Sequence, residues 1–317
     1  MQQFVARLAD TARHIGLRVI ALPYEFGEVS IEDALDRVGR FEQAVGFLSR
    51  FISTPEYYEQ LYQGAIAHGI AMINTVGGSR TLMEFDRFYP LISDLTAPSV
   101  IIRTSADCES ALATLGSPAF VKGLVKSRKE NGWEACLAHD TSELEAMLAR
   151  AERFEISERG AVIARTILPL RQNGVQVAGF PVSREYRVYV LDGAVIGSGF
   201  YGKGYDTFGP LTDAETDELL KLAASVAGRI DVRLAAVDVA QLTDGSWTVI
   251  ELGDPQYSGI AHMPHHLLCT PSLTRATDTA ESDSHDEPPA TTPAWRAEGR
   301  DATPRASMTL NCGSGGL

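Results

Sequence analysis

Two Asp-Gly pairs, each between two β-strand patterns, constrain the fold of this chain more than any other feature. The segments REYRVYVLDGAVIGSGFY and LAAVDVAQLTDGSWTVIELGD place their turns at Asp192-Gly193 and Asp244-Gly245. Asp-Gly between such runs is a strong hairpin signal, because both residues tolerate the positive φ that a tight turn needs. A helical pattern over residues 213–230 separates the two hairpins. The chain from residue 184 therefore predicts an antiparallel sheet with one helix.

The first third of the chain has a different pattern, in which helices and short apolar runs alternate. The expected elements are a helix near residues 4–15, a strand at 17–22, a helix over 31–51, a helix capped by Ser53 or Thr54, and a strand at 71–73. Such alternation is typical of a small, mostly parallel sheet covered by helices.

A middle region links these two parts. It is expected to contain strands at 99–104 and 119–127 around a helix from Ala106, a capped helix over 141–154, and a further strand in AVIARTILPL. The fold class is therefore α/β and α+β. The expected domains are residues 1–94, 95–168, 169–269 and a disordered tail at 270–317. The tail contains no Val, Ile, Phe or Tyr and cannot bury enough apolar surface to offset its ordering entropy.

Charge and cysteine spacing exclude several classes of protein. The formal net charge is −13, which argues against a surface built for nucleic acid. The first 24 residues carry charges at Arg7, Asp10, Arg13 and Arg18, so we expect no signal peptide and no membrane span. The four cysteines form no Cys-x-x-Cys pair, which predicts reduced thiols. A cytoplasmic location is the default expectation.

A basic cluster stands out in this acidic chain. In the segment FVKGLVKSRKENGW, Lys122 and Lys126 share one face of a predicted strand, and Ser127, Arg128 and Lys129 continue into a turn. Two buried ammonium groups need an anion. The cluster therefore predicts a site for a small anion, and the alternative is an edge strand with solvated lysines.

Two glycine motifs and a histidine cluster have simpler explanations than the sites they resemble. GSGFYG, residues 197–202, matches Gly-x-Gly-x-x-Gly but follows a hairpin strand and opens no helix, so it does not predict a dinucleotide site. A P-loop needs Ser or Thr after its Lys, whereas Gly204 follows Lys203. The loop at Lys203 remains a candidate for substrate contact. HMPHH, residues 262–266, is better explained as an exposed segment than as a metal site.

Carboxylates on the second hairpin predict a metal site. The Asp244-Gly245 turn brings the strand of Asp238 beside the strand of Glu251, and Asp254 lies close by. A buried carboxylate needs a partner, and Mg²⁺ is a natural one. The alternative is a set of salt bridges from Asp238 to Arg187 or Arg233.

The order of these motifs resembles the ATP-grasp superfamily, and most closely a poorly characterised clade of it. The resemblance covers about residues 95–262. It is carried by FVKGLVKSRK, then REYRVYVLDG, then DVAQLTDGSWTVIELGDPQYSGI, with GIAMINTVGGSRTLMEFDRFYPLI similar to the segment that joins a preceding domain. It implies an ATP-grasp fold with an N-terminal α/β, pre-ATP-grasp-like domain.

The resemblance also implies roles for named residues. ATP would lie between two α+β halves, with its adenine on the backbone of AVIARTIL, its phosphates on lysines, and Arg187 on the γ-phosphate. The implied site residues are Lys122, Lys126, Ser127, Lys129, Arg165 and Ile167 for ATP, Arg187 and Lys203 for catalysis, and Asp238, Glu251 and Asp254 for Mg²⁺. One departure concerns the metal, because Gly253 replaces the Asn that is usual two residues after the Glu.

The activity implied by the resemblance is that of an ATP-dependent, ADP-forming ligase. Such enzymes phosphorylate a carboxylate, and an amine or less often a thiol displaces the phosphate. The expected cofactors are ATP and Mg²⁺. The expected partners are a small-molecule or peptide carboxylate and an amine, with no nucleic acid and no membrane; a homodimer is compatible with this interpretation. The alternatives are a small-molecule kinase and a nucleotide-binding module that has lost turnover.

Overall fold

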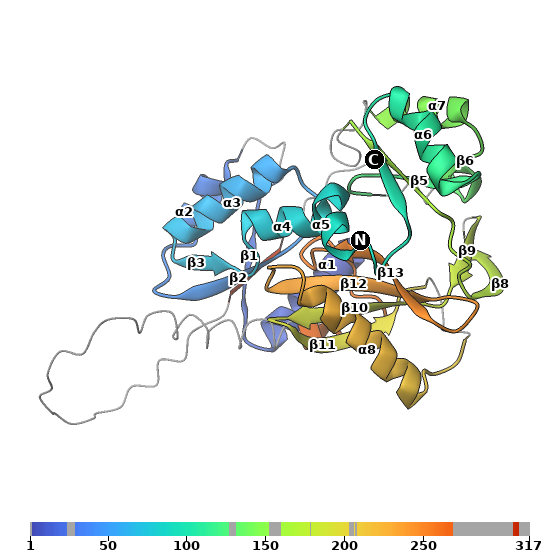
Figure 1. Cartoon of the computed structure of the whole chain (residues 1–317). Helices are drawn as coiled ribbons and strands as arrows, with labels where there is room; N and C mark the ends of the chain where they lie inside the picture. The colour runs from blue at the N-terminus through green and yellow to red at the C-terminus, as the bar shows by residue number, and fades with distance from the viewer. Residues whose placement is uncertain are drawn as a thin grey trace, which may run out of the picture. The chain divides into compact units, whose positions relative to one another are not determined.

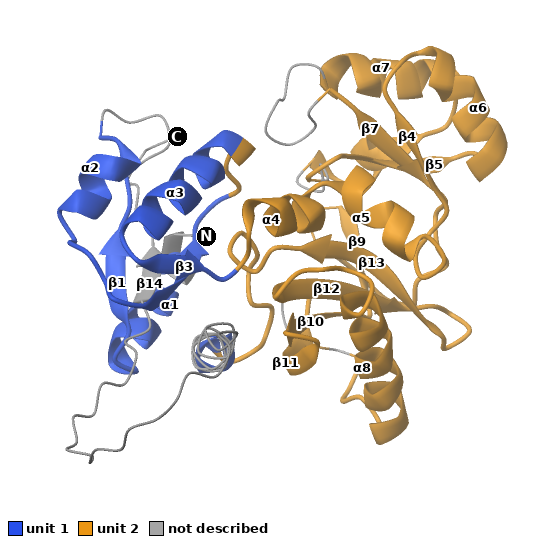
Figure 2. Ribbon diagram, turned by 60° about the vertical axis from the view of Figure 1, so that its left-hand side comes forward, with its two compact units in different colours: residues 1–51, 56–73, 265–317 blue, residues 52–55, 74–264 orange. Residues whose placement is uncertain are grey.

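The structure is a computed structural model that describes residues 2–23, 29–126, 131–151, 160–177, 179–202, 206, 208–268 and 307–310. The chain divides into two compact units (Figures 1 and 2). Unit 1 comprises residues 1–51, 56–73 and 265–317, and unit 2 comprises residues 52–55 and 74–264. In the part of the chain that the structure describes, no helix has the length and apolar character to cross a bilayer.

Unit 1 is an α/β unit with a parallel sheet of order β1-β14-β2-β3. Its elements are α1 (Gln2–His14), β1 (Arg18–Ala21), α2 (Ile31–Asp36), β2 (Ala44–Ser49), α3 (Pro55–Ala67), β3 (Ile70–Met72) and β14 (Ser307–Leu310). The expected helix over residues 31–51 is wrong, because α2 ends at Asp36 and β2 follows. All six residues of β2 are buried, as in a central strand covered on both faces.

Strand β14 also departs from expectation. It lies between β1 and β2 and pairs with both in parallel, so residues 307–310 are not a disordered tail. Its place depends on main-chain pairing with strands far earlier in the chain, which a composition argument cannot detect. The remainder of the expected tail after residue 269 lies outside the described residues.

Unit 2 contains two four-stranded sheets and a small two-stranded one, which pairs β8 with β9. Its elements are α4 (Val76–Met83), α5 (Phe85–Ile92), β4 (Ser99–Ile102), α6 (Ala106–Leu115), β5 (Ala119–Gly123), η2 (Glu134–Cys136), β6 (Leu137–Ala138), α7 (Thr141–Ala151), β7 (Val162–Arg165), β8 (Gln172–Val177), β9 (Phe180–Ser183), β10 (Glu185–Leu191), β11 (Ala194–Phe200), α8 (Asp213–Ala227), β12 (Leu234–Gln241) and β13 (Trp247–Gly253).

The first four-stranded sheet of unit 2, here called the small sheet, has the order β4-β7-β5-β6. Helices α6 and α7 bury Cys108, Ala111, Leu144 and Leu148 against one of its faces. Strand β5 ends at Gly123, so the expected strand to residue 127 is too long. Lys122 therefore lies in the sheet, whereas Lys126 lies beyond it.

The second sheet, here called the large sheet, is antiparallel with the order β11-β10-β12-β13. Both predicted hairpins are confirmed. Asp192 and Gly193 adopt φ of 47° and 78° between β10 and β11, and Gly245 adopts φ of 93° between β12 and β13. Helix α8 packs on one face through Leu219, Ala223 and Val226 (Figure 1). The opposite face is left for other side chains.

The boundary between the units lies at residue 73 and not near residue 94. Helices α4 and α5 follow the last strand of unit 1, but their apolar side chains join the core of the large sheet. Leu82, Phe85, Phe88 and Ile92 belong to the same buried cluster as Val188 of β10 and Val237 of β12. Long-range packing therefore assigns this segment to unit 2.

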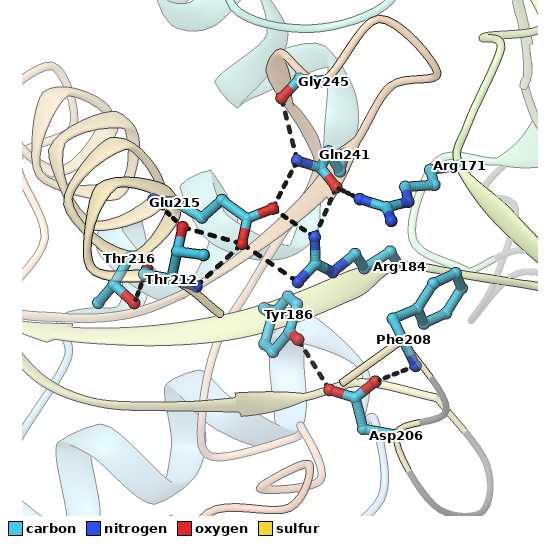
Figure 3. A network of polar contacts seen from close by, with 10 residues as sticks. All are labelled: Arg171, Arg184, Tyr186, Asp206, Phe208, Thr212, Glu215, Thr216, Gln241 and Gly245. Carbon is cyan, nitrogen blue, oxygen red and sulfur yellow. Dashed lines mark hydrogen bonds and ion pairs between the residues drawn. The ribbon is translucent and has the colours of Figure 1, made fainter. Parts of the chain in front are cut away.

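A buried polar network fixes α8 to the large sheet (Figure 3). Thr212 caps the helix in a capping box with Glu215, and the Glu215 carboxylate also accepts hydrogen bonds from Arg184, which precedes β10, and from Gln241 of β12. Arg184 and Arg171 both donate to the Gln241 Oε1 atom, at 2.8 Å and 2.9 Å. The Thr212 backbone N–H first, and then Arg184, lower the pKa of Glu215 to about 2. The network stays ionised at neutral pH.

We expect Glu215→Gln to lower the free energy of unfolding of unit 2 by about 1.5 to 3 kcal/mol, because charge-assisted hydrogen bonds are lost beside a buried arginine. Since the pKa of Glu215 is depressed in the folded state, its stabilisation is complete above its ordinary pKa of 4.5 and is lost as the pH falls through about 2. Urea unfolding at pH 7 and pH 3 tests this. Glu218→Gln, at an exposed site of the same helix, is the control. Equal stability of the two variants at pH 7 would contradict the assignment.

Strand β14 generates a second prediction. A chain that ends after residue 306 loses β14 and leaves β1 and β2 without the strand that pairs with both of them. We expect thermal unfolding of unit 1 to lose its cooperativity and shift to lower temperature, while a chain that ends after residue 310 keeps it. If the two truncated chains melt alike, β14 does not contribute to unit 1.

Candidate functional site

Three charged side chains form a row across the large sheet. Arg187 of β10 is the ladder partner of Asp238 of β12, and Asp238 is the ladder partner of Glu251 of β13. Directly opposed residues in an antiparallel sheet point to the same face. Neighbouring residues such as Val188 and Val237 point the other way, into the core with α8. The charged row therefore occupies the face that α8 does not cover.

Arg187 and Asp238 form a buried bidentate ion pair. The Arg187 Nε and Nη2 atoms donate to the two carboxylate oxygens of Asp238, each at 2.7 Å, and the two residues are 6% and 2% exposed. Burial alone would lower the pKa of Arg187, but the adjacent Asp238 charge outweighs it and raises that pKa well above its ordinary value. The salt-bridge alternative for Asp238 is thus the one observed, with Arg187, since Arg233 pairs with Asp192.

Lys122 connects the small sheet to this row. Its ammonium group donates to the Glu251 Oε1 atom, and the residue is only 4% exposed although it carries a full charge. Its position in β5 places it on the face of the small sheet opposite Val121, which packs with α6 and α7. The row therefore continues from one sheet to the other as Arg187, Asp238, Glu251 and Lys122, with two positive and two negative charges.

Asp254 does not join this row. It is completely buried, and its oxygens accept hydrogen bonds from the Asn74 side chain at 3.1 Å and from the backbone and side chain of Gln256 at 3.0 Å and 3.1 Å. Burial raises its pKa. Asn74 also exchanges two hydrogen bonds with the backbone of Leu234, where β12 begins. Asp254 therefore fastens the end of β13 to the start of β12.

A pocket of about 530 Å³ opens beside the row. One end is apolar and includes three aromatic rings, Phe120, Trp133 and Phe180, with Trp133 and Phe180 centred 5.0 Å apart. The backbone segment Thr166–Leu168 lines the same pocket. Lys122 and Glu251 line it as well and supply its charged part. The pocket therefore combines a flat apolar region with a charged one.

Arg165 lines the pocket but is engaged in joining the two sheets. Its guanidinium donates to the Ser99 Oγ at 3.1 Å, the Ile250 carbonyl at 2.8 Å and the Thr96 Oγ1 at 2.7 Å. Burial lowers its pKa to about 10, which leaves it charged at neutral pH. Its main role is thus to hold β7 against β13.

The other predicted residues have varied positions. Ile167 lines the pocket, and Lys126 is exposed just beyond β5. Ser127, Lys129 and Lys203 lie outside the described residues. Sequence reasoning did not identify the aromatic residues, or Tyr201, which lines the pocket and lies with its ring centre 4.1 Å from the Arg187 guanidinium carbon. Trp133 could have been found as an aromatic residue at the end of the basic cluster, but nothing in the sequence brings Phe180 to it.

The donor set fits one hard cation better than a complete protein cage. Among the described residues, no group of three or more His, Cys, Asp or Glu side chains could hold a metal ion. Mg²⁺ however often takes only one or two protein carboxylates and completes its shell with phosphates and water. Adjacent Asp238 and Glu251 satisfy that requirement, whereas the oxygens of buried Asp254 bind Asn74 and Gln256.

Solved structures with a similar fold include ligases. An L-amino acid ligase from Bacillus licheniformis aligns with a TM-score of 0.53 and 14% identity, over 79% of this chain and 64% of that one. A D-alanine–D-alanine ligase from Bacillus anthracis complexed with ATP aligns with a TM-score of 0.50 and 15% identity, over 70% and 74%. An N5-carboxyaminoimidazole synthase from Aspergillus clavatus, in complex with ADP and its ribonucleotide, aligns with a TM-score of 0.50 and 13% identity, over 79% and 67%. At these identities the likeness establishes the fold.

Comparison of sequences leads to the same fold. No curated protein matches the chain significantly. A family of ATP-grasp domains, the third family of its clade within the superfamily, matches residues 114–275, a segment that includes the charged row and both hairpins. The expected resemblance and fold class are confirmed, and the chain belongs to this clade family of the ATP-grasp superfamily.

Proposed function

We propose that the chain is an ATP-dependent ligase that joins a carboxylate to an amine or a thiol and releases ADP and phosphate. The observation that carries this proposal is the pocket in which Lys122 and Glu251 border an apolar region lined by Phe120, Trp133 and Phe180. An aromatic slot beside paired charges suits a nucleotide, which has a flat base at one end and phosphates at the other.

The adenine would lie among these three rings and hydrogen-bond the backbone of Thr166–Leu168. Lys122 would contact the phosphates, and Arg187 would contact the transferring one. These roles need positive charge and fixed position more than a special base, which is what phosphoryl transfer requires of a protein. Lys126, Ser127, Lys129 and Lys203 remain proposed contacts on the same grounds as in the sequence.

Asp238 and Glu251 would hold Mg²⁺, which neutralises charge on the phosphates when it is bound. In the structure both carboxylates are paired with protein cations, Asp238 with Arg187 and Glu251 with Lys122. The same four groups can serve a nucleotide, because the cations are available to phosphates once the carboxylates gain another partner. The ion pairs thus prevent uncompensated buried charge before the ligand binds.

The proposed reaction has two steps. A carboxylate oxygen of the substrate attacks the γ-phosphorus of ATP, the bond to the β-phosphate oxygen breaks, and ADP leaves with that electron pair. The amine nitrogen then attacks the carbonyl carbon of the acyl phosphate. Phosphate leaves with the electrons of the carbon–oxygen bond, and the nitrogen loses a proton to solvent or base. Arg187 and Lys122 stabilise negative charge in the first step.

One observation favours a second candidate, a nucleotide-binding module without turnover. A Cβ atom at Gly253 would lie 2.8 Å from the Ser258 Oγ, so the Asn that is usual at this position does not fit without movement of Ser258. The metal then has one fewer protein ligand. Such a module would bind ATP but would not release ADP.

Measurement of ADP release with paired panels of small acids and amines tests the proposal. A ligase should form ADP only when both co-substrates are present, and a kinase should need one acceptor. Glu251→Gln keeps shape but removes a charge, so we expect a loss of ADP formation of about 100-fold or more with the fold retained. Glu218→Gln on the exposed side of α8 is the control.

A thermal shift with ATP but no ADP from any pair would favour the binding module. The proposal is wrong if ATP neither shifts the melting temperature nor yields ADP. Full activity of Glu251→Gln at saturating ATP and Mg²⁺ would remove Glu251 from the metal site.

A further inference from the structure

The segment after β13 folds back onto the charged face of the large sheet. The Gly259 carbonyl accepts two hydrogen bonds, from the Arg187 Nη1 atom at 2.8 Å and from the Tyr189 hydroxyl at 2.7 Å. Further along, a Cβ atom at Gly199 of β11 would lie 2.8 Å from the Met263 backbone N, so the segment lies directly on the strands. The segment is therefore part of the surroundings of Arg187.

Contacts at three sides fix the Arg187 guanidinium. Asp238 takes the Nε–H and one N–H of Nη2, Gly259 takes one N–H of Nη1, and the Tyr201 ring centre lies 4.1 Å from its carbon. Of the five N–H groups of an arginine, this leaves one on each terminal nitrogen. The Gly259 carbonyl, together with Asp238, determines where those two N–H groups point.

Tyr189 in turn determines where the Gly259 carbonyl lies. It is two residues from Arg187 on the same strand and face, and it is fully buried. Burial raises the pKa of its phenol, which keeps the hydroxyl protonated and able to donate. The segment also contains Ala261 at φ of 54°, a left-handed conformation that a non-glycine residue adopts only when its surroundings hold it there.

We propose that Tyr189 is a positioning residue for Arg187, and that through the Gly259 carbonyl it aims the remaining N–H groups of Arg187 at the terminal phosphate of a bound nucleoside triphosphate. The inference rests on the proposed ATP site. It differs from a purely structural role, because it predicts an effect on triphosphate recognition beyond any effect on stability.

The same strand supplies a matched control. Tyr186 lies on the opposite face of β10, is 6% exposed, and donates its hydroxyl to the Asp206 Oδ2 atom at 2.8 Å. Its ring packs in the core with Phe200 and Trp247, on the side of the sheet away from the charged row. Tyr186→Phe and Tyr189→Phe therefore each remove one buried hydroxyl from β10, and only the second reaches Arg187.

The experiment measures the affinities of both variants and the wild type for ATP and for ADP by calorimetry, with melting temperatures alongside. Loss of one buried hydrogen bond should lower the melting temperatures of the two variants similarly. We expect only Tyr189→Phe to lower the ratio of ATP to ADP affinity, by about 5- to 10-fold, as loss of one well-directed contact to phosphate would do. In an Arg187→Lys background, Tyr189→Phe should leave this ratio unchanged.

An unchanged ratio in Tyr189→Phe, or an equal fall in Tyr186→Phe, would overturn the inference. If Tyr189→Phe does not fold, Ala261→Gly is the second variant. Glycine accepts the left-handed conformation without strain but loosens the segment. It should stay folded and lower the same ratio, and an unchanged ratio would overturn the inference. Failure of the wild type to bind ATP would remove the proposed function as well, whereas ATP binding with no effect of Tyr189 removes this inference alone.

Discussion

The buried pair of Arg187 and Asp238 is the interaction on which the rest of the site depends. Both charges are almost completely removed from water, and two hydrogen bonds of 2.7 Å compensate each for the other. Removal of either partner would leave an uncompensated buried charge, which is far more costly than loss of a surface ion pair. Because the pair joins two central strands of the large sheet, it is both part of the fold and part of the proposed catalytic face.

The neighbouring charges extend this logic across the unit. Lys122 of the small sheet pairs with Glu251, and Arg165 of the same sheet donates to the backbone beside Glu251 and to Thr96. The two sheets therefore meet through cations of one and carboxylate or carbonyl oxygens of the other. A nucleotide that enters the pocket competes for these same cations, so ligand binding and sheet contact are coupled by shared residues.

Local patterns predicted more of this arrangement than long-range ones. The Asp192-Gly193 and Asp244-Gly245 turns and the opposed positions of Asp238 and Glu251 could be predicted, because a hairpin fixes its own register. The expectation for Asp254 as a metal ligand remains a prediction, but its hydrogen bond with Asn74, 180 residues earlier, has no sequence signal. The same holds for β14 and for α4 and α5, whose places depend on distant strands.

The most direct test of the central claim is calorimetric comparison of metal-free ATP in EDTA with Mg·ATP as ligands of the full chain. ATP alone would take Lys122 and Arg187 from their carboxylates and leave Glu251 and Asp238 beside a polyanion. The account therefore predicts that Mg·ATP binds at least about 10-fold more tightly than metal-free ATP, a coupling of about 1.4 kcal/mol or more. Equal affinity for the two ligands would contradict an exchange of partners at this site.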